Sequence, residues 1–219
     1  HAITVPPFMI LSVTTRCNLS CKGCYARSFA SPSKTEMSAD DFSSIVFQAR
    51  DLGISIILLA GGEPLMRKEL FDVAAACPTV LFPLFTNGLM LDETRIGALR
   101  RRRNLIPVLS IEGGRDHTNA RRGNGVFERI GSRMEALRHS GIFFGVSLTI
   151  TAGNFDELTG ESFISSLRKK GCMLFFYVEY VPVEPGSEAD VLTLKQRETL
   201  VPLMRRFSRR FGALFIAFP

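Results

Sequence analysis

Cys17-Asn18-Leu19-Ser20-Cys21-Lys22-Gly23-Cys24 holds three cysteines in a C-x3-C-x2-C run. Thiolates are soft ligands that select iron–sulfur clusters, zinc or copper. A cluster of four irons normally takes four cysteines, so three cysteines in one loop would bind three irons and leave the fourth open to another molecule. A zinc site is an alternative, but it needs a fourth ligand, and His117 and His139 are distant in sequence. A disulfide would leave one of the three cysteines unpaired.

The cysteine run follows an apolar stretch, residues 8–14, which predicts a buried strand. Later apolar stretches alternate with helical patterns, and this alternation favours parallel strands joined by helices in an α/β fold. Ser38 is expected to cap the first long helix, because acidic residues follow it in the first turn. Further strands are expected over residues 54–60, 80–85, 105–111, 142–150 and 173–181, with another beginning at 214–218. Further helices are expected over residues 65–76, 91–103, 126–140, 155–170 and 194–211, and a loop over 26–35.

Gly61-Gly62-Glu63-Pro64 follows the second expected strand directly. Two glycines allow a backbone to approach a ligand without an intervening Cβ. Glu63 adds a carboxylate that can bind an ammonium group, and Pro64 stiffens the turn. By itself the pattern also fits an ordinary turn between a strand and a helix.

Polar and glycine-rich motifs also end the later strands, at the edge where parallel α/β folds carry their chemistry. They are Thr86-Asn87-Gly88 after the third strand, Ser110-Ile111-Glu112-Gly113 after the fourth with Arg122-Gly123 and Gly125-Val126-Phe127 beyond it, and Thr149, Thr151 and Asn154 after the fifth. The asparagine–glycine and threonine positions also have a local explanation as turn and capping residues.

The cysteine run after a first strand, with GGEP after the second, resembles the signature of radical S-adenosylmethionine (SAM) enzymes. The resemblance implies that Cys17, Cys21 and Cys24 ligate a 4Fe–4S cluster and that SAM chelates the open iron. An electron from the cluster would then cleave SAM to methionine and a 5′-deoxyadenosyl radical, which abstracts a hydrogen from the substrate. The implied fold is the radical SAM core, an open (β/α)6 partial TIM barrel, because a complete eight-unit barrel takes about 250 residues.

The same resemblance assigns residues to SAM. GGEP would bind the methionyl amino group, and the serine and arginine after the fourth strand would bind the carboxylate, which suits the planar fork of arginine. Arg121 competes with Arg122 for that role, and the spacing from Ser110 favours Arg122. The aromatic residue that commonly precedes the third cysteine is Gly23 here, which leaves Tyr25 either as the adenine contact or as a core residue. The implied SAM-binding residues are Gly61, Gly62, Glu63, Pro64, Ser110, Arg122, Tyr25, Asn87, Thr149 and Thr151.

The motif after the fourth strand resembles the peptide-modifying and cofactor-maturing branch of the family. Members of that branch often act on peptide or protein substrates and usually carry a C-terminal domain with further cysteine-bound clusters. No cysteine follows Cys172, so either the sequence omits such a domain, which we favour, or the protein lacks auxiliary clusters. The chain of residues 1–219 is therefore expected to be a single core domain, truncated at its C-terminus, that needs an external electron donor such as a flavodoxin or ferredoxin.

Composition sets the remaining expectations. The content of 46% hydrophobic and 22% charged residues is ordinary for a soluble protein, and no apolar run reaches the roughly 20 residues of a membrane helix. Residues 1–7 lack the pattern of a signal peptide. Five cysteines, three of them clustered, do not resemble a disulfide framework, so a reducing cytoplasm is expected.

The formal net charge is +6, with arginines clustered at 100–103, 205–206 and 209–210. These positions fit solvated helix faces, because the arginines of the last helix fall between its apolar residues. A basic stripe is also typical of nucleic-acid binding, so a radical SAM enzyme acting on RNA remains an alternative. A non-catalytic zinc or iron–sulfur protein is the other.

Overall fold

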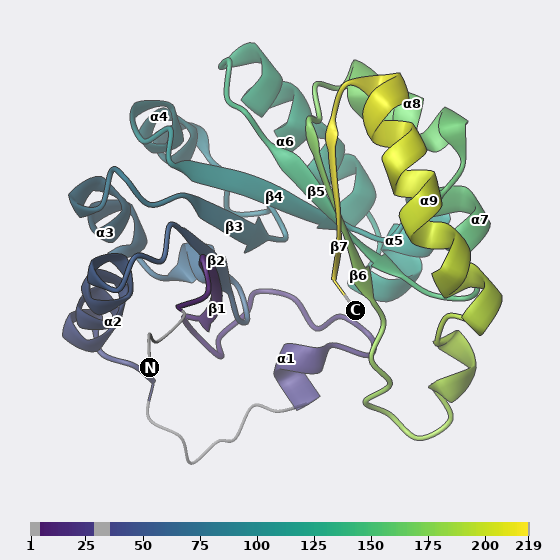
Figure 1. The fold of residues 1–219 in the computed structure, drawn as a ribbon, viewed down its shortest axis with the longest axis horizontal. Helices are drawn as coiled ribbons and strands as arrows, with labels where there is room; N and C mark the ends of the chain where they lie inside the picture. Colours follow the sequence, from purple (N-terminus) through teal and green to yellow (C-terminus); the bar gives the residue numbers. More distant parts are fainter. Residues whose placement is uncertain (1–4, 29–35, 219) are drawn as a thin grey trace.

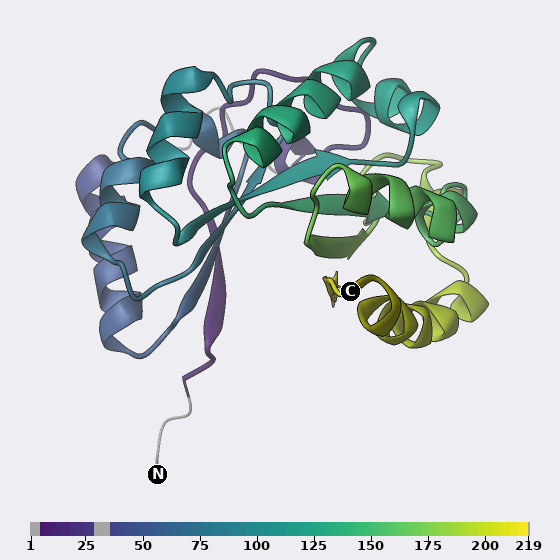
Figure 2. The same cartoon turned by 90° about the horizontal axis from the view of Figure 1, so that it is seen from above.

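The computed structural model describes residues 5–28 and 36–218. Seven parallel strands form one sheet in which the spatial order follows the sequence. The sheet curls into a half-barrel, and helices cover its convex face (Figures 1 and 2). The strands are β1 (Phe8–Ser12), β2 (Ile56–Ala60), β3 (Phe82–Thr86), β4 (Leu105–Ile111), β5 (Gly145–Ile150), β6 (Leu174–Glu179) and β7 (Leu214–Phe218).

Helices connect successive strands, and one longer helix in each connection returns the chain from the carboxyl edge of the sheet to its amino edge. Ser38 caps α2 by accepting from the Asp41 amide, as its sequence predicts, and Thr193 with Gln196 forms a capping box on α9. The helices are α1 (Tyr25–Ser28), α2 (Ala39–Asp51), η1 (Pro64–Met66), α3 (Leu70–Ala76), α4 (Glu93–Arg101), α5 (Arg115–Arg122), α6 (Val126–His139), α7 (Phe155–Leu158), α8 (Glu161–Lys169), η2 (Glu188–Asp190) and α9 (Leu194–Phe211).

The sheet buries apolar side chains on both faces. The convex face and the helices share the larger core, and a smaller cluster around Leu58, Val108 and Phe176 fills the concave face. Phe85 of β3 meets Phe176 of β6 edge to face, with ring centroids 5.0 Å apart. Because β4 and β5 lie between those two strands, the rings meet across the concave side and form an apolar floor below the carboxyl edge.

The predicted (β/α)6 partial barrel is confirmed, with β7 as an additional parallel strand beside β6. Two helix predictions are wrong in detail. The helix over 65–76 is interrupted after η1, where Arg67 has an extended backbone and donates to the carbonyl of Met37 at 2.6 Å. The helix over 155–170 is split into α7 and α8, because Gly160 has an extended conformation between them.

Two further segments differ from the sequence-based expectation. The helix α5 was not predicted, because its sequence RDHTNARR carries no apolar periodicity. The expected loop over 26–35 is helical in its first part, as α1, and residues 29–35 lie outside the described part of the chain. Within the described ranges, no helix has both the length and the apolar character needed to cross a membrane.

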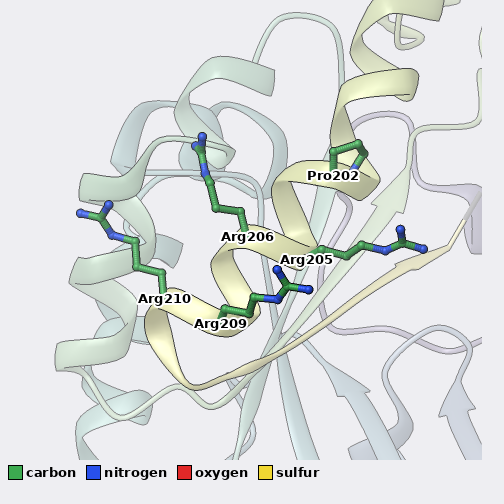
Figure 3. Close-up of a pocket in the computed structure, with 5 residues that line it drawn as sticks. All are labelled: Pro202, Arg205, Arg206, Arg209 and Arg210. Carbon is green, nitrogen blue, oxygen red and sulfur yellow. The ribbon is translucent and has the colours of Figure 1, made fainter.

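Charge is sorted along the helices. Acidic residues occupy the first turns of α2, α4, α6 and α8, and basic residues occupy their last turns. This arrangement complements the helix macrodipole and gathers basic groups at the amino edge of the sheet. The last turns of α9 extend this basic edge, with Arg206 and Arg210 on one side of the helix and Arg205 and Arg209 on the other (Figure 3). Arg210 pairs with Glu161 of α8 at 2.9 Å, as expected for a solvated helix face.

Candidate active site at the carboxyl edge of the sheet

The cysteine loop leaves the carboxyl end of β1. Cys17 is exposed and Cys21 and Cys24 are partly buried, all three as free thiols. Burial raises the pKa of the Cys17 and Cys21 thiols, and a negative charge on Cys24 raises both further, so the three sulfurs act on one another. In the part of the chain that the structure describes, no three Cys, His, Asp or Glu side chains form a ready metal site.

The donor set of this loop fits an iron–sulfur cluster. Its three soft thiols come from one short stretch and are electrostatically coupled. Each would bind a different iron, whereas a zinc site needs its ligands around a single ion. Cys77 and Cys172, by contrast, are fully buried.

Glu36 anchors the chain that enters the cysteine loop. Its carboxylate accepts hydrogen bonds from the Thr14 hydroxyl at 2.6 Å and the Thr15 amide at 3.0 Å, and from the Arg16 guanidinium at 3.1 Å. These donors, with the Thr14 hydroxyl first, lower the pKa of Glu36 to about 2. The sequence did not indicate Glu36, because its contacts join residues twenty or more positions apart.

The depressed pKa of Glu36 predicts an acid-dependent loss of stability. The unfolded chain binds a proton near the usual pKa of 4.5, and the folded chain does so only near 2. The contribution is therefore complete above pH ~4.5 and is lost as the pH falls towards ~2. Urea unfolding of the parent chain and of Glu36→Gln between pH 6 and 3 checks this, with Glu135→Gln at an exposed position as control. The stability difference between parent and Glu36→Gln should shrink below pH 4, and a constant difference would contradict the assignment.

The Gly61-Gly62 pair lies directly against the chain that leads into the cysteine loop. The Gly62 amide donates to the Thr14 carbonyl and the Glu63 amide to the Arg16 carbonyl, each at 2.7 Å. A Cβ on Gly62 would lie 2.1 Å from the Arg16 carbonyl oxygen, and one on Gly61 would lie 2.4 Å from that of Thr14. The sequence predicted glycines for a close approach to a ligand, whereas here the close approach is to the chain itself.

Gly62→Ala is accordingly expected to destabilise the protein. The new methyl group meets backbone rather than a flexible side chain, so the two segments must separate, at a cost of about 2 kcal/mol. Thermal unfolding followed by circular dichroism measures this. Gly53→Ala is the strained control, because a Cβ there meets nothing within 4 Å although φ is +93°. A Gly62→Ala protein as stable as the parent would mean that the contact with Arg16 is unimportant.

Glu63 is buried and bridges the ends of β2 and β3. Its carboxylate accepts from the Thr86 hydroxyl at 2.6 Å, the Asn87 amide at 2.8 Å and the Leu65 amide at 3.1 Å. Burial raises the pKa of Glu63, and these donors act against that rise. A carboxylate offers about four acceptor positions, so one remains for a further donor. Pro64 is buried at the start of η1.

Asn87 lies between β3 and the cysteine loop. Its side-chain amide donates to the Asn18 side chain at 2.8 Å and lies 3.9 Å from the Cys17 sulfur. The structure therefore places this expected SAM contact against Cys17, one of the three expected cluster ligands.

Two neighbouring arginines at the end of α5 have different partners. Arg122 binds the buried Glu112 with two parallel hydrogen bonds of 2.6 Å, from Nε and Nη2. Burial lowers the pKa of Arg122, but the charge and hydrogen bonds of Glu112 more than offset this, so the pKa lies above its usual value. Arg121 donates to the backbone of Lys22 and Gly23 in the cysteine loop, and its Nη1 also lies 3.6 Å from the Glu112 carboxylate. The sequence did not indicate that Glu112 pairs with Arg122.

The end of β5 is organised by Asn154. Its side-chain amide donates to the carbonyls of Glu112 and Thr149, and its side-chain oxygen accepts from the Thr151 amide. In return, the Asn154 backbone amide donates to the Thr151 hydroxyl oxygen at 3.2 Å. Thr151 and Asn154 therefore have the capping and turn roles that the sequence left open, and Asn154 also links β5 to β4.

The remaining expected residues lie around the same edge. Ser110 is partly buried on β4 and aligned with Ser147 of β5. Tyr25 begins α1 and is 57% exposed, so the alternative that it packs in the core is wrong. His117, to which the sequence assigned no role, lies 3.5 Å from Glu157 with both side chains partly exposed.

Comparisons with known proteins agree with this geometry. The sequence pattern of the radical SAM superfamily matches residues 11–163. The AdoMet-dependent heme synthase of Methanosarcina barkeri is 28% identical over 205 residues, which cover 91% of this chain and 58% of that protein. The sporulation killing factor maturation protein SkfB of Bacillus subtilis is 30% identical over 159 residues, 71% of this chain and 38% of that protein.

Solved structures show the same fold. SuiB of Streptococcus suis bound to S-adenosylmethionine superposes with a TM-score of 0.77 at 16% identity, over 98% of this chain and 51% of SuiB. At that identity the likeness concerns the fold. The chain spans about half the length of the curated relatives it matches most fully.

Proposed function

This chain belongs to the radical SAM superfamily, whose enzymes use a 4Fe–4S cluster and SAM, and on that premise we propose that Cys17, Cys21 and Cys24 hold the cluster. The observation that carries the proposal is the position of the cysteine loop, which follows β1 and whose entering segment, at Thr14 and Arg16, is hydrogen-bonded to the GGEP turn after β2. When bound, cluster and SAM supply one-electron reduction and hydrogen abstraction. The protein supplies ligands, orientation and exclusion of water.

The residues around the loop have donors and acceptors left for SAM. Glu63 keeps one acceptor position, which suits the amino group of the methionyl moiety. Arg122 gives Glu112 one N–H from Nε and one from Nη2. Since a guanidinium has five N–H donors, three remain for a carboxylate. Below them, the apolar floor of Phe85 and Phe176 keeps water from the concave side.

We infer a peptide or protein as the substrate class. SkfB is named as the maturation protein of the sporulation killing factor, and SuiB was also solved bound to its precursor peptide SuiA. An iron tetrapyrrole is the second candidate, favoured by the heme synthase relative that covers 91% of the chain. The proposed electron donor is a flavodoxin or ferredoxin, and the chain is proposed to act in the cytoplasm.

Anaerobic reconstitution with iron and sulfide, followed by EPR of the reduced protein with and without SAM, tests the proposal. A 4Fe–4S signal that changes shape on addition of SAM supports SAM at the open iron. A cluster signal that does not change on addition of SAM contradicts the proposal, and so does zinc bound without sulfide. Formation of 5′-deoxyadenosine in the presence of a peptide library or of iron coproporphyrin then separates the two substrate classes. RNA as a substrate would require binding that weakens steeply with salt.

A further inference from the structure

The two residues between Cys21 and Cys24 have every backbone polar group occupied by later parts of the chain. The Lys22 amide donates to the Arg121 carbonyl at 2.9 Å, and the Lys22 carbonyl accepts from Arg121 Nε at 3.1 Å. The Gly23 carbonyl accepts from Arg121 Nη2 at 3.1 Å. The Gly23 amide donates to the Glu184 carboxylate at 3.3 Å. Such complete pairing is usual inside secondary structure but here belongs to a loop.

Tyr180, which follows β6, closes the same arrangement. The Arg121 guanidinium lies over the Tyr180 ring, 5.6 Å from its centroid. A Cβ on Gly23 would lie 2.8 Å from the Tyr180 hydroxyl, and Gly23 has φ +57°, so glycine is required by both space and conformation. Tyr180 itself is buried, and its backbone amide donates a hydrogen bond of 3.1 Å to the Ile150 carbonyl, which fixes its position.

Together with Arg121, the neighbouring Arg122 makes α5 a link between the cysteine loop and the end of β4. Consecutive helix residues project about 100° apart, so Arg121 meets the cysteine loop while Arg122 meets Glu112 at the end of β4. The position of the cysteine loop is thereby tied to the edge of the sheet proposed to receive SAM.

We propose that Arg121, Tyr180 and Glu184 are positioning residues that hold Cys21 and Cys24 in place for the cluster. That these residues serve a cluster rests on the proposed function, but they hold the cysteine loop in place in the metal-free chain as well. The three residues contact the Lys22-Gly23 segment and not Cys17, whose surroundings come from Asn87 and the Glu36 anchor. The inference therefore predicts a local effect on two of the three cysteines.

The test is thiol alkylation of the metal-free full chain with iodoacetamide, read at each cysteine by peptide mass spectrometry. In Arg121→Gln, the loss of two charge-assisted hydrogen bonds is expected to speed alkylation of Cys21 and Cys24 about tenfold. Cys17 should react at the parent rate. Removing a positive charge lowers the thiolate fraction and slows alkylation, so a faster reaction reports release of the loop.

Three variants make the result specific. Arg115→Gln, at an exposed position of α5, is the matched control and should react as the parent does. Arg121→Lys should restore part of the protection, since an ammonium reaches one carbonyl but does not reproduce the fork. Glu184→Gln, which keeps the shape of the side chain, should give a smaller increase at the same two cysteines.

If Cys21 and Cys24 are alkylated at the parent rate in both Arg121→Gln and Glu184→Gln, the inference is overturned. An equal acceleration at Cys17 would overturn it too, because it would indicate general loosening. Circular dichroism checks that each variant is folded. If Arg121→Gln is not folded, the alkylation rates of Glu184→Gln test the inference. In reconstituted protein, Arg121→Gln should also lose iron to a chelator faster than the parent. A parent chain that forms no cluster would refute the proposed function and leave the alkylation result standing.

Discussion

Replacing Cys17, Cys21 or Cys24 by alanine is expected to abolish the 4Fe–4S cluster and SAM cleavage together. Each thiol would hold a different iron, and no other free cysteine of the described residues lies near the loop, since Cys77 and Cys172 are buried elsewhere. Iron and sulfide content after anaerobic reconstitution should fall to near background, and formation of 5′-deoxyadenosine should stop.

Cys77→Ala is the matched control for these variants. Cys77 is fully buried at the end of α3, so its replacement should cost about 1 kcal/mol of stability through a small cavity. Iron content should remain that of the parent. If Cys24→Ala kept a full cluster and cleaved SAM normally, the assignment of ligands would be wrong.

Glu112→Gln is expected to cause the largest loss of stability among the variants considered. The side chains of Glu112 and Arg122 are 4% and 11% exposed and share two hydrogen bonds of 2.6 Å. Removing one charge leaves the other buried without a partner, which typically costs about 3 kcal/mol. For a domain of this size that corresponds to a fall of roughly 10 °C in the thermal midpoint.

A control and a double variant test the explanation. Glu128→Gln removes a partly exposed ion pair with Arg115 and should cost less than about 1 kcal/mol. Replacing both partners, as in Glu112→Leu with Arg122→Met, should recover part of the stability because the Arg122 charge is no longer buried without a partner. The recovery should be incomplete, since Arg121, whose Nη1 lies 3.6 Å from Glu112, keeps its charge and loses this contact. A Glu112→Gln protein as stable as the parent would show that the pair contributes little to folding.

The sequence was sufficient to predict the strands and the edge that carries the site. Each strand is a mostly apolar run, and parallel strands bring the cysteine loop and the GGEP turn to one edge whatever the details of packing. The count of six units was also correct, with β7 added. Helix α5 was not predicted because polar contacts with the cysteine loop and with Glu112 at the end of β4, rather than an apolar face, hold it in place.

The roles of individual polar residues could not be predicted in the same way. Arg121 and Arg122 are adjacent and chemically identical. Their roles differ because Arg121 donates to the Gly23 carbonyl in the cysteine loop, whereas Arg122 makes both hydrogen bonds to Glu112 at the end of β4. Likewise, the contacts of Glu36 and Tyr180 join segments far apart in sequence. Short-range patterns carry no information on such pairings.

The sorting of charge along the helices gives the molecule an electric dipole moment. Its positive pole is the amino edge of the sheet, where the last turns of α4, α6, α8 and α9 gather. On a cation-exchange bead or an anionic electrode the protein should therefore adsorb in one orientation, with this edge against the surface. The cysteine loop would then face the solution, in reach of a soluble reductant but remote from the electrode itself.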